Sequence, residues 1–225
     1  MSRPPMNDLQ AIIFDLDGLM ADTEPLHMLA FNLVLQAAHV SHQYDRKEYG
    51  EKFVGITLQK NAEDVCEQFA LPQSPDDIVR AQRALFSLLI SDARNVKPMP
   101  GLCELLDFVE QRGLTKAVAS GSQQDEVEKI LRGLGVTKRF PHVVSGTGMR
   151  PKPDPEIYLT ALGRLGASPA HTLALEDSNA GVRAAQAAGL HVIAVPSEFT
   201  RHQSLTEADS IADSLTDVIS YLSRD

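Results

Sequence analysis

The chain is poor in the residues and segments that would mark several large classes of protein. It has no tryptophan, and its two cysteines, Cys66 and Cys103, lie on separate helical patterns and form no CxxC pair. This spacing disfavours a disulfide framework and indicates two reduced thiols without a functional role. No apolar run approaches the roughly 18 residues of a membrane helix, and the opening residues 1–10 hold no apolar stretch like the core of a secretion signal. We therefore expect a cytoplasmic protein without a membrane partner.

The chain also has fewer basic than acidic residues. Lysine and arginine number 21 against 30 aspartates and glutamates, which gives a formal net charge of −9. Because nucleic acids favour basic surfaces, a nucleic-acid partner is not expected. A small phosphorylated metabolite remains compatible, since a bound divalent cation and one lysine can reverse the field locally. The 225 residues, 43% of them hydrophobic, allow one large domain or a domain with a sizeable insertion.

The most informative segment is the apolar run 11–14, which is followed directly by Asp15 and Asp17. Its short length and abrupt end are typical of a buried strand. Charged groups are rarely buried unless they are paired or bound to a metal. We therefore expect a cationic group beside these two carboxylates.

Other apolar runs also stop at polar residues, and helical patterns separate them. The run 116–119 ends at Ser120, the run 172–175 ends at Glu176 and Asp177, and a further run covers 191–195. Strands that alternate with helices predict an α/β fold with a parallel sheet, whose strands all end at one edge. Open sheets of this kind bind ligands at that edge, where these polar side chains would gather.

The segment from Thr23 to Lys97 shows apolar residues at helical spacing and no strand pattern, and it ends at a proline-rich breaker, 97–101. We interpret it as a helical insertion placed directly behind the first strand. Such an insertion projects over the carboxyl edge of the sheet, where it would act as a lid.

The acidic residues at the predicted edge suit an all-oxygen Mg²⁺ site. Asp15 and Asp177 would contribute side chains, Asp17 its backbone carbonyl, and Glu176 a ligand bound directly or through water.

A second set of residues suits an anion. Lys152 lies between prolines in the segment 150–155, which can aim its ammonium at a fixed point. Ser120 and Ser122, with the amides around Gly121 near a helix N-terminus, supply further donors for phosphate.

Carboxylate, magnesium, lysine and hydroxyl around one point indicate phosphoryl transfer. Asp15 would attack phosphorus and form an aspartyl-phosphate, and Asp17 would protonate the leaving oxygen and then deprotonate the hydrolytic water. Burial and a neighbouring carboxylate would favour a proton on Asp17, whereas the metal would oppose it.

Four segments, taken in order, resemble the motifs of the haloacid dehalogenase-like hydrolase superfamily: DLDGLMADTEP, VASGS, RPKPDP and LEDSNAGVRAA. The resemblance implies a Rossmann-like three-layer core of residues 1–22 and 98–225, with a helical cap of residues 23–97. It places the nucleophile on Asp15, the acid/base on Asp17, the phosphate-binding hydroxyl on Ser120, the lysine on Lys152 and the metal acids on Glu176 and Asp177. An acid at Asp17 argues against dehalogenases, which lack one there, and favours phosphate esters as substrates.

Within that superfamily the chain is similar to sugar-phosphate phosphatases and β-phosphoglucomutase, which share Thr23 and His27. The resemblance makes these two residues candidates for substrate or phosphate binding. The mutase carries an arginine in a cap segment GVSRED, and Leu58 stands at the matching position here. The resemblance therefore implies a Mg²⁺-dependent phosphomonoester hydrolase with an aspartyl-phosphate intermediate, a sugar phosphate being the favoured substrate.

Other interpretations remain open at this point. A phosphosugar mutase, a phospho-accepting signalling module and a catalytically idle binding protein could each use part of the same residue set. His27 could be a packing residue, and Ser178 and Asn179 could serve only to cap a helix. The sequence does not decide whether Glu24 and Gly55 face the substrate, and it indicates no oligomeric state.

Overall fold

The computed structural model describes residues 8–223, so most of the opening segment 1–10 lies outside the described residues. A parallel sheet forms the centre of the molecule, with strand order β3-β2-β1-β4-β5-β6. The strands are β1 (Ala11–Phe14), β2 (Thr115–Ser120), β3 (His142–Ser145), β4 (Thr172–Glu176), β5 (His191–Ala194) and β6 (Ser210–Ile211). The predicted α/β fold with a parallel sheet is confirmed. The short strands β3 and β6 were not expected from the sequence.

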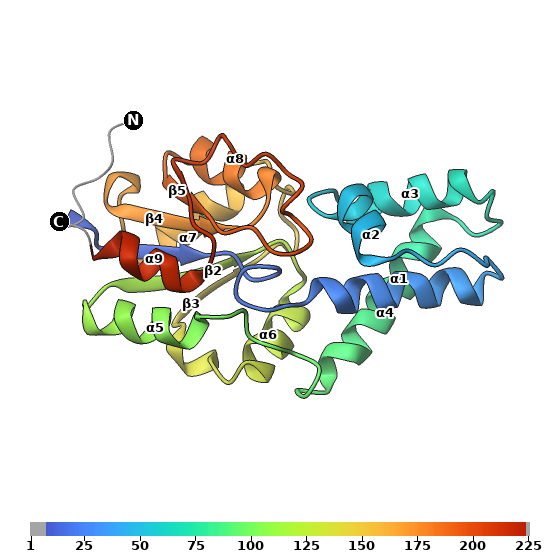
Figure 1. The fold of residues 1–225 in the computed structure, drawn as a ribbon, viewed down its shortest axis with the longest axis horizontal. Helices are drawn as coiled ribbons and strands as arrows, with labels where there is room; N and C mark the ends of the chain where they lie inside the picture. The colour runs from blue at the N-terminus through green and yellow to red at the C-terminus, as the bar shows by residue number, and fades with distance from the viewer. Residues whose placement is uncertain (1–7, 224–225) are drawn as a thin grey trace.

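Helices cover both faces of the sheet, which gives the three-layer arrangement seen in Figure 1. One face packs against α5 (Leu102–Gln111), α6 (Gln124–Gly133) and α9 (Leu215–Leu222). The other face packs against α7 (Glu156–Leu165) and α8 (Asn179–Ala187), and the short 3-10 turns Thr137–Arg139 and Pro169–His171 lie between elements. Strand β1 is buried on both faces because Ile12 and Phe14 point into the first apolar layer and Ile13 into the second.

The segment between β1 and α5 folds into four helices that lie beside the core, at the right of Figure 1. They are α1 (Glu24–Ala37), α2 (Arg46–Phe53), α3 (Leu58–Gln68) and α4 (Pro75–Ser91). Helix α2 carries few apolar residues and was not expected from hydrophobic periodicity. The four helices enclose an apolar cluster of their own, with Phe31, Phe53 and Ile78 among its buried members.

The two places where the chain passes between the core and these helices lie side by side. The backbone N–H of Asp22 donates to the carbonyl of Lys97 at 2.9 Å, and Met99 donates to Met20 at 2.9 Å. The expected boundaries at 22/23 and 97/98 therefore fall at adjacent points, and we use them as a working division into core and cap.

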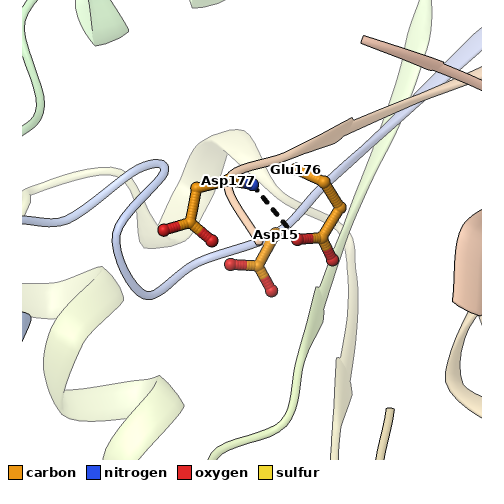
Figure 2. Close-up of side chains that lie close together, drawn as sticks. All are labelled: Asp15, Glu176 and Asp177. Atoms are coloured by element: carbon orange, nitrogen blue, oxygen red, sulfur yellow. Dashed lines mark hydrogen bonds between the residues drawn. The ribbon is translucent and has the colours of Figure 1, made fainter. Parts of the chain in front are cut away.

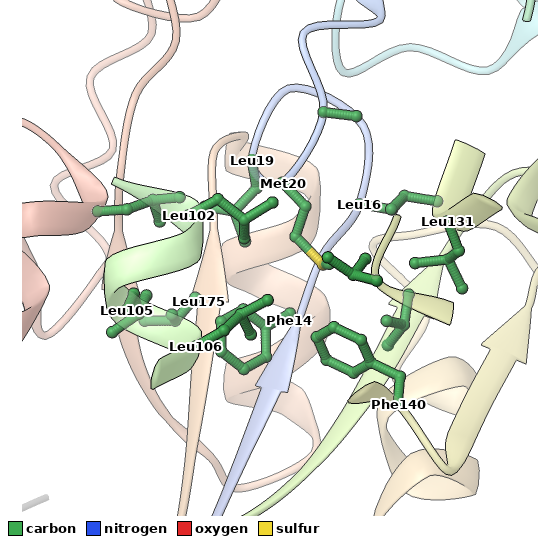
Figure 3. Packing of buried hydrophobic residues seen from close by; sticks show 14 of the residues in the cluster. Phe14, Leu16, Leu19, Met20, Leu102, Leu105, Leu106, Leu131, Phe140 and Leu175 are labelled. Carbon is green, nitrogen blue, oxygen red and sulfur yellow. The ribbon is translucent and has the colours of Figure 1, made fainter. Parts of the chain in front are cut away.

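The turn that follows β1 is fixed by its apolar residues. Leu16, Leu19 and Met20 are fully buried in the layer that also holds Phe14 and Phe140, whose rings meet edge to face at 5.6 Å (Figure 3). Because Leu16 lies between Asp15 and Asp17, its burial fixes the backbone on which both carboxylates are carried.

Within residues 8–223, none of the helices combines the length and the apolar character needed to cross a membrane.

Candidate active site

Lys152 links the end of β1 to the end of β4. Its Nζ lies 2.5 Å from Asp15 Oδ1 and 2.6 Å from Glu176 Oε1, and it also donates to the Ala119 carbonyl at 3.2 Å. Burial opposes the charge of the ammonium, but the two carboxylates outweigh burial and raise the pKa of Lys152. The lysine is therefore held as a cation beside Asp15.

Three buried carboxyl groups gather at this edge of the sheet. Single oxygens of Asp15, Glu176 and Asp177 all lie within 4.8 Å of one another, and Figure 2 shows the side chains converging from the ends of β1 and β4. Burial, followed by the charges of the neighbouring acids, raises the pKa of Asp15 and of Asp177 well above the usual range, although Lys152 acts to lower both. A bound cation would offset the free-energy cost of keeping these buried carboxylates ionised.

The surroundings of Asp177 fit such a cation. Its Oδ2 atom is buried and accepts no hydrogen bond from any residue in the described part of the chain. Gly18, at φ +79°, lies so close that a Cβ there would collide with this oxygen. A buried oxygen without a donor beside other carboxylate oxygens is the donor set that Mg²⁺ prefers.

The Glu176 carboxylate accepts more hydrogen bonds than the carboxylates of Asp15 and Asp177. Its carboxyl is 0% exposed, Oε1 accepts from Lys152 and from the Tyr158 hydroxyl, and Oε2 accepts from the Asp177 N–H at 3.2 Å. The sequence did not single out Tyr158, which reads as an ordinary apolar position on α7. Glu176 thus orients Lys152 at least as much as it offers a metal ligand.

Asp17 is not one of the three clustered acids, and its carboxylate lies among hydrogen-bond donors. Its Oδ1 accepts from Thr23 Oγ1 at 2.7 Å, and its Oδ2 accepts from Ser122 Oγ at 2.8 Å and from Ser120 Oγ at 3.1 Å. Burial acts to raise the pKa of Asp17, but His27 and then the Thr23 and Ser122 hydroxyls outweigh burial and lower it to about 2. From the sequence, burial and a neighbouring carboxylate favoured a proton on Asp17 and the metal opposed it; the hydrogen-bond donors that converge on this carboxylate could not be identified from the sequence.

His27 lies on α1 and is fixed by α4. Its Nε2 is 3.9 Å from Asp17 Oδ1, its Nδ1 is 3.2 Å from Gln82 Nε2, and its ring stacks on Phe86 at 3.6 Å between centroids. Burial opposes protonation, but Asp17 and Glu24 outweigh burial and raise the pKa of His27. The contacts of His27 with Gln82 and Phe86 could not have been identified from a one-dimensional pattern.

The serine loop after β2 is ordered by internal contacts. Ser120 Oγ accepts from the Ser122 N–H at 3.1 Å, and both hydroxyls donate to Asp17. Gly121 and Ser122 line the cavity, whereas Ser120 is fully buried and does not line it. Their predicted contact with phosphate stays a prediction.

A cavity of about 570 Å³ lies between the core and the cap, within the size range of small-molecule sites. The core contributes Asp15, Asp17, Lys152 and Asp177 to its walls, together with Gly121 and Ser122. The cap contributes Glu24, His27, residues 54–59, Val79 and Arg83. Glu24 and Gly55, which the sequence left undecided, thus both face the cavity.

Comparison with known proteins agrees with this geometry. The sequence profile of the haloacid dehalogenase-like hydrolases matches residues 12–195. Protein CbbY of Cereibacter sphaeroides is 33% identical over 221 residues, with 93% of this chain and 94% of the relative covered. The chain belongs to the haloacid dehalogenase-like hydrolase family, and it is a phosphatase-type member of that family.

Two further relatives and one solved structure are named for different phosphorylated compounds. A probable pseudouridine-5'-phosphatase of Drosophila melanogaster is 31% identical, with 96% of this chain and 94% of the relative covered. The β-phosphoglucomutase of Bacillus subtilis is 31% identical, with 83% of each chain covered. A crystal structure of a CbbY mutant from Rhodobacter sphaeroides in complex with xylulose-(1,5)bisphosphate has a TM-score of 0.79 and 32% identity, and covers 93% of this chain and 96% of that chain.

Proposed function

We propose that the protein is a Mg²⁺-dependent phosphomonoester hydrolase that acts on a small phosphorylated metabolite through an aspartyl-phosphate on Asp15. The observation that carries the proposal is the position of the Lys152 ammonium, 2.5 Å from Asp15 Oδ1, beside a buried carboxylate cluster at the floor of the cavity. This places fixed positive charge next to the candidate nucleophile, where a phosphoryl group would bring its negative oxygens.

In the proposed first step, a carboxylate oxygen of Asp15 forms a bond to phosphorus while the ester P–O bond breaks. Asp17 gives its proton to the departing oxygen. Because Asp17 is ionised in the free protein, it can serve as the acid only if it gains a proton when substrate binds. The negative charge of an arriving phosphate favours that proton because it raises the pKa of a nearby carboxyl.

In the second step, Asp17 takes a proton from water, the water oxygen bonds to phosphorus, and the bond between phosphorus and Asp15 breaks. Inorganic phosphate leaves and Asp15 is restored. Mg²⁺ held by Asp15, Asp177 and the Asp17 carbonyl, with Glu176 directly or through water, would supply charge that offsets the phosphoryl oxygens.

The cavity supports a sugar phosphate as the substrate. Its cap wall offers polar side chains to hydroxyl groups, among them Glu24, Gln59 and Arg83. Arg83 forms no ion pair within residues 8–223, whereas Arg150, the other arginine of the cavity, pairs with Asp154 at 2.8 Å. The relatives named for phosphorylated nucleosides and sugars are consistent with this class of substrate.

The mutase alternative has less support. Leu58 stands where the mutase carries the arginine for its second phosphate, and it lines the cavity. A phospho-accepting signalling module would need neither Asp17 nor a cap over the site. The cytoplasmic location and the absence of a nucleic-acid partner, both expected from composition, remain part of this proposal.

A phosphorus NMR assay with Mg²⁺ tests the proposal on a panel of hexose phosphates, pentose phosphates, phosphoglycolate and nucleoside monophosphates. We expect free phosphate to accumulate from at least one sugar phosphate, and Asp15→Asn to lower the rate at least about 10³-fold. The matched control Asp64→Asn, which changes an exposed aspartate of the cap, should leave the rate unchanged. Migration of the phosphoryl group on the hexose without release would favour the mutase, and a long-lived acyl-phosphate without turnover would favour the signalling module.

A further inference from the structure

The segment 196–205, which follows β5, makes a second connection between core and cap. Phe199 is 2% exposed and packs among the buried residues of the cap cluster, of which it is the one described member from outside 24–97. Its ring meets Tyr49 edge to face at 6.2 Å. Gly50 allows this approach, because a Cβ there would lie 2.8 Å from the Phe199 carbonyl oxygen.

Gln203 adds a polar bridge to this apolar contact. Its Nε2 donates to the Val54 carbonyl of the cap at 3.2 Å, and its Oε1 accepts from the Asn179 N–H of the core at 2.7 Å. The two ends of one amide therefore join two parts of the molecule that are more than a hundred residues apart. The side chain is half-buried, which limits competition from water.

One partner of Gln203, Val54, lines the cavity, and the other, Asn179, lies between two residues that line it, Ser178 and Ala180. Val54 begins the stretch 54–59 that forms the cap wall, and Asn179 comes two residues after the acidic Asp177. Ser178 caps α8 by accepting from the Gly181 N–H at 3.2 Å, whereas Asn179 Oδ1 accepts from the Leu205 N–H at 3.1 Å. The Asn179 side chain thus holds the segment that carries Gln203, whereas the cap of α8 is provided by Ser178.

We propose that Gln203 is a positioning residue that sets the distance between the cap wall at Val54 and the acidic end of β4. It touches no reacting atom in this arrangement. Its effect on substrate binding rests on the proposed function, but its effect on the position of the cap does not, so the two can be tested separately.

Gln203→Glu is the variant that separates the two halves of the bridge. A carboxylate can still accept from the Asn179 N–H, but it cannot donate to the Val54 carbonyl and repels its oxygen. The matched control is Gln186→Glu, because Gln186 is also half-buried and donates to a backbone carbonyl, that of Glu207, at a place away from the cap.

The two native cysteines provide the measurement. Cys66 lies on α3 of the cap and Cys103 on α5 of the core, and both thiols are free. With a spin label on each cysteine, pulsed electron paramagnetic resonance measures the distance between the two labels, and so between cap and core, in the full chain. We expect a broader distribution shifted to longer distances in Gln203→Glu, and an unchanged distribution in Gln186→Glu. Identical distributions in Gln203→Glu and wild type, or equal shifts in both variants, would overturn the proposal.

Kinetics give a second readout with the best sugar phosphate of the panel. Loss of one hydrogen bond between cap and core should raise KM about five-fold in Gln203→Glu, with kcat less affected. A fall in kcat at constant KM would contradict a positioning role. If no sugar phosphate is turned over by the wild type, the proposed function fails, while the distance measurement still decides the role of Gln203.

Discussion

The core wall and the cap wall of the cavity differ in how firmly their side chains are held. On the core wall, Asp17 accepts three hydrogen bonds and Lys152 makes three, and all of these contacts are partly buried. On the cap wall, Ile56 is 46% exposed and Arg83 has no ion-pair partner within residues 8–223. The difference teaches that the groups we propose to react are held in place by hydrogen bonds, whereas Ile56 and Arg83, on the substrate side of the cap, are left adaptable.

The strongest test of this comparison is Asp17→Asn. Because the amide keeps the shape of the carboxyl but cannot exchange a proton, we expect both chemical steps to slow by about 10²- to 10³-fold. Magnesium binding, measured by calorimetry, should persist because only the backbone carbonyl of Asp17 is assigned to the ion. Normal turnover in this variant would show that the core wall does not supply the acid and base.

A smaller effect is expected at the cap wall from Arg83→Met, which keeps an apolar stem and removes the charge. Loss of a charge-assisted contact with substrate should raise KM about ten-fold, with kcat within about two-fold. Arg80→Met is the matched control, because Arg80 lies on the same helix but pairs with Asp77 outside the cavity. Equal KM values in wild type and Arg83→Met would show that adaptable cap residues do not contribute to binding.

The smallest effect concerns stability and Glu24. Burial, which His27 opposes, raises the pKa of Glu24 from 4.5 to about 7. The folded protein therefore holds a proton that the unfolded chain has lost between these pH values, so this group reduces stability as pH rises from about 4.5 to about 7. Relative to pH 5, Glu24→Gln should gain about 1–2 kcal/mol over wild type at pH 8.

Urea unfolding of wild type and Glu24→Gln at both pH values, with chelator present, measures this difference. The comparison across pH cancels the intrinsic effect of glutamine on the fold. A constant difference between the two proteins at pH 5 and pH 8 would show that the cap side of the cavity imposes no penalty on this carboxyl.

The sequence predicted the core wall better than the cap wall for a physical reason. Strands β1, β2 and β4 are buried on both faces, so they appear as apolar runs that end at their polar residues. Parallel strands bring those ends to one edge, which is how Asp15, Ser120 and Glu176 could be grouped before any coordinates were known. Strand β3 is only partly buried and β6 has two residues, so neither gave a comparable signal.

Contacts that depend on helix packing could not be predicted in this way. The stacking of His27 on Phe86 joins α1 to α4, and the hydrogen bond from Tyr158 to Glu176 joins α7 to β4. Periodicity assigns a residue to a face of its helix but does not say which residue of another element it will meet. The groups around Asp17 could not be assembled from the sequence for the same reason, since they come from the start of α1 and from the loop after β2.

The adjacent backbone crossings at Asp22 and Lys97 have an evolutionary consequence. Because backbone hydrogen bonds join the entry and exit of the four-helix segment, the segment is inserted at what is in effect one point of the core. A helical segment of different length or shape could replace it without a change in the register of the sheet, provided that it offered a pocket for Phe199. New substrate ranges could thus arise by exchange of whole inserts, while the catalytic floor beneath them stayed as it was.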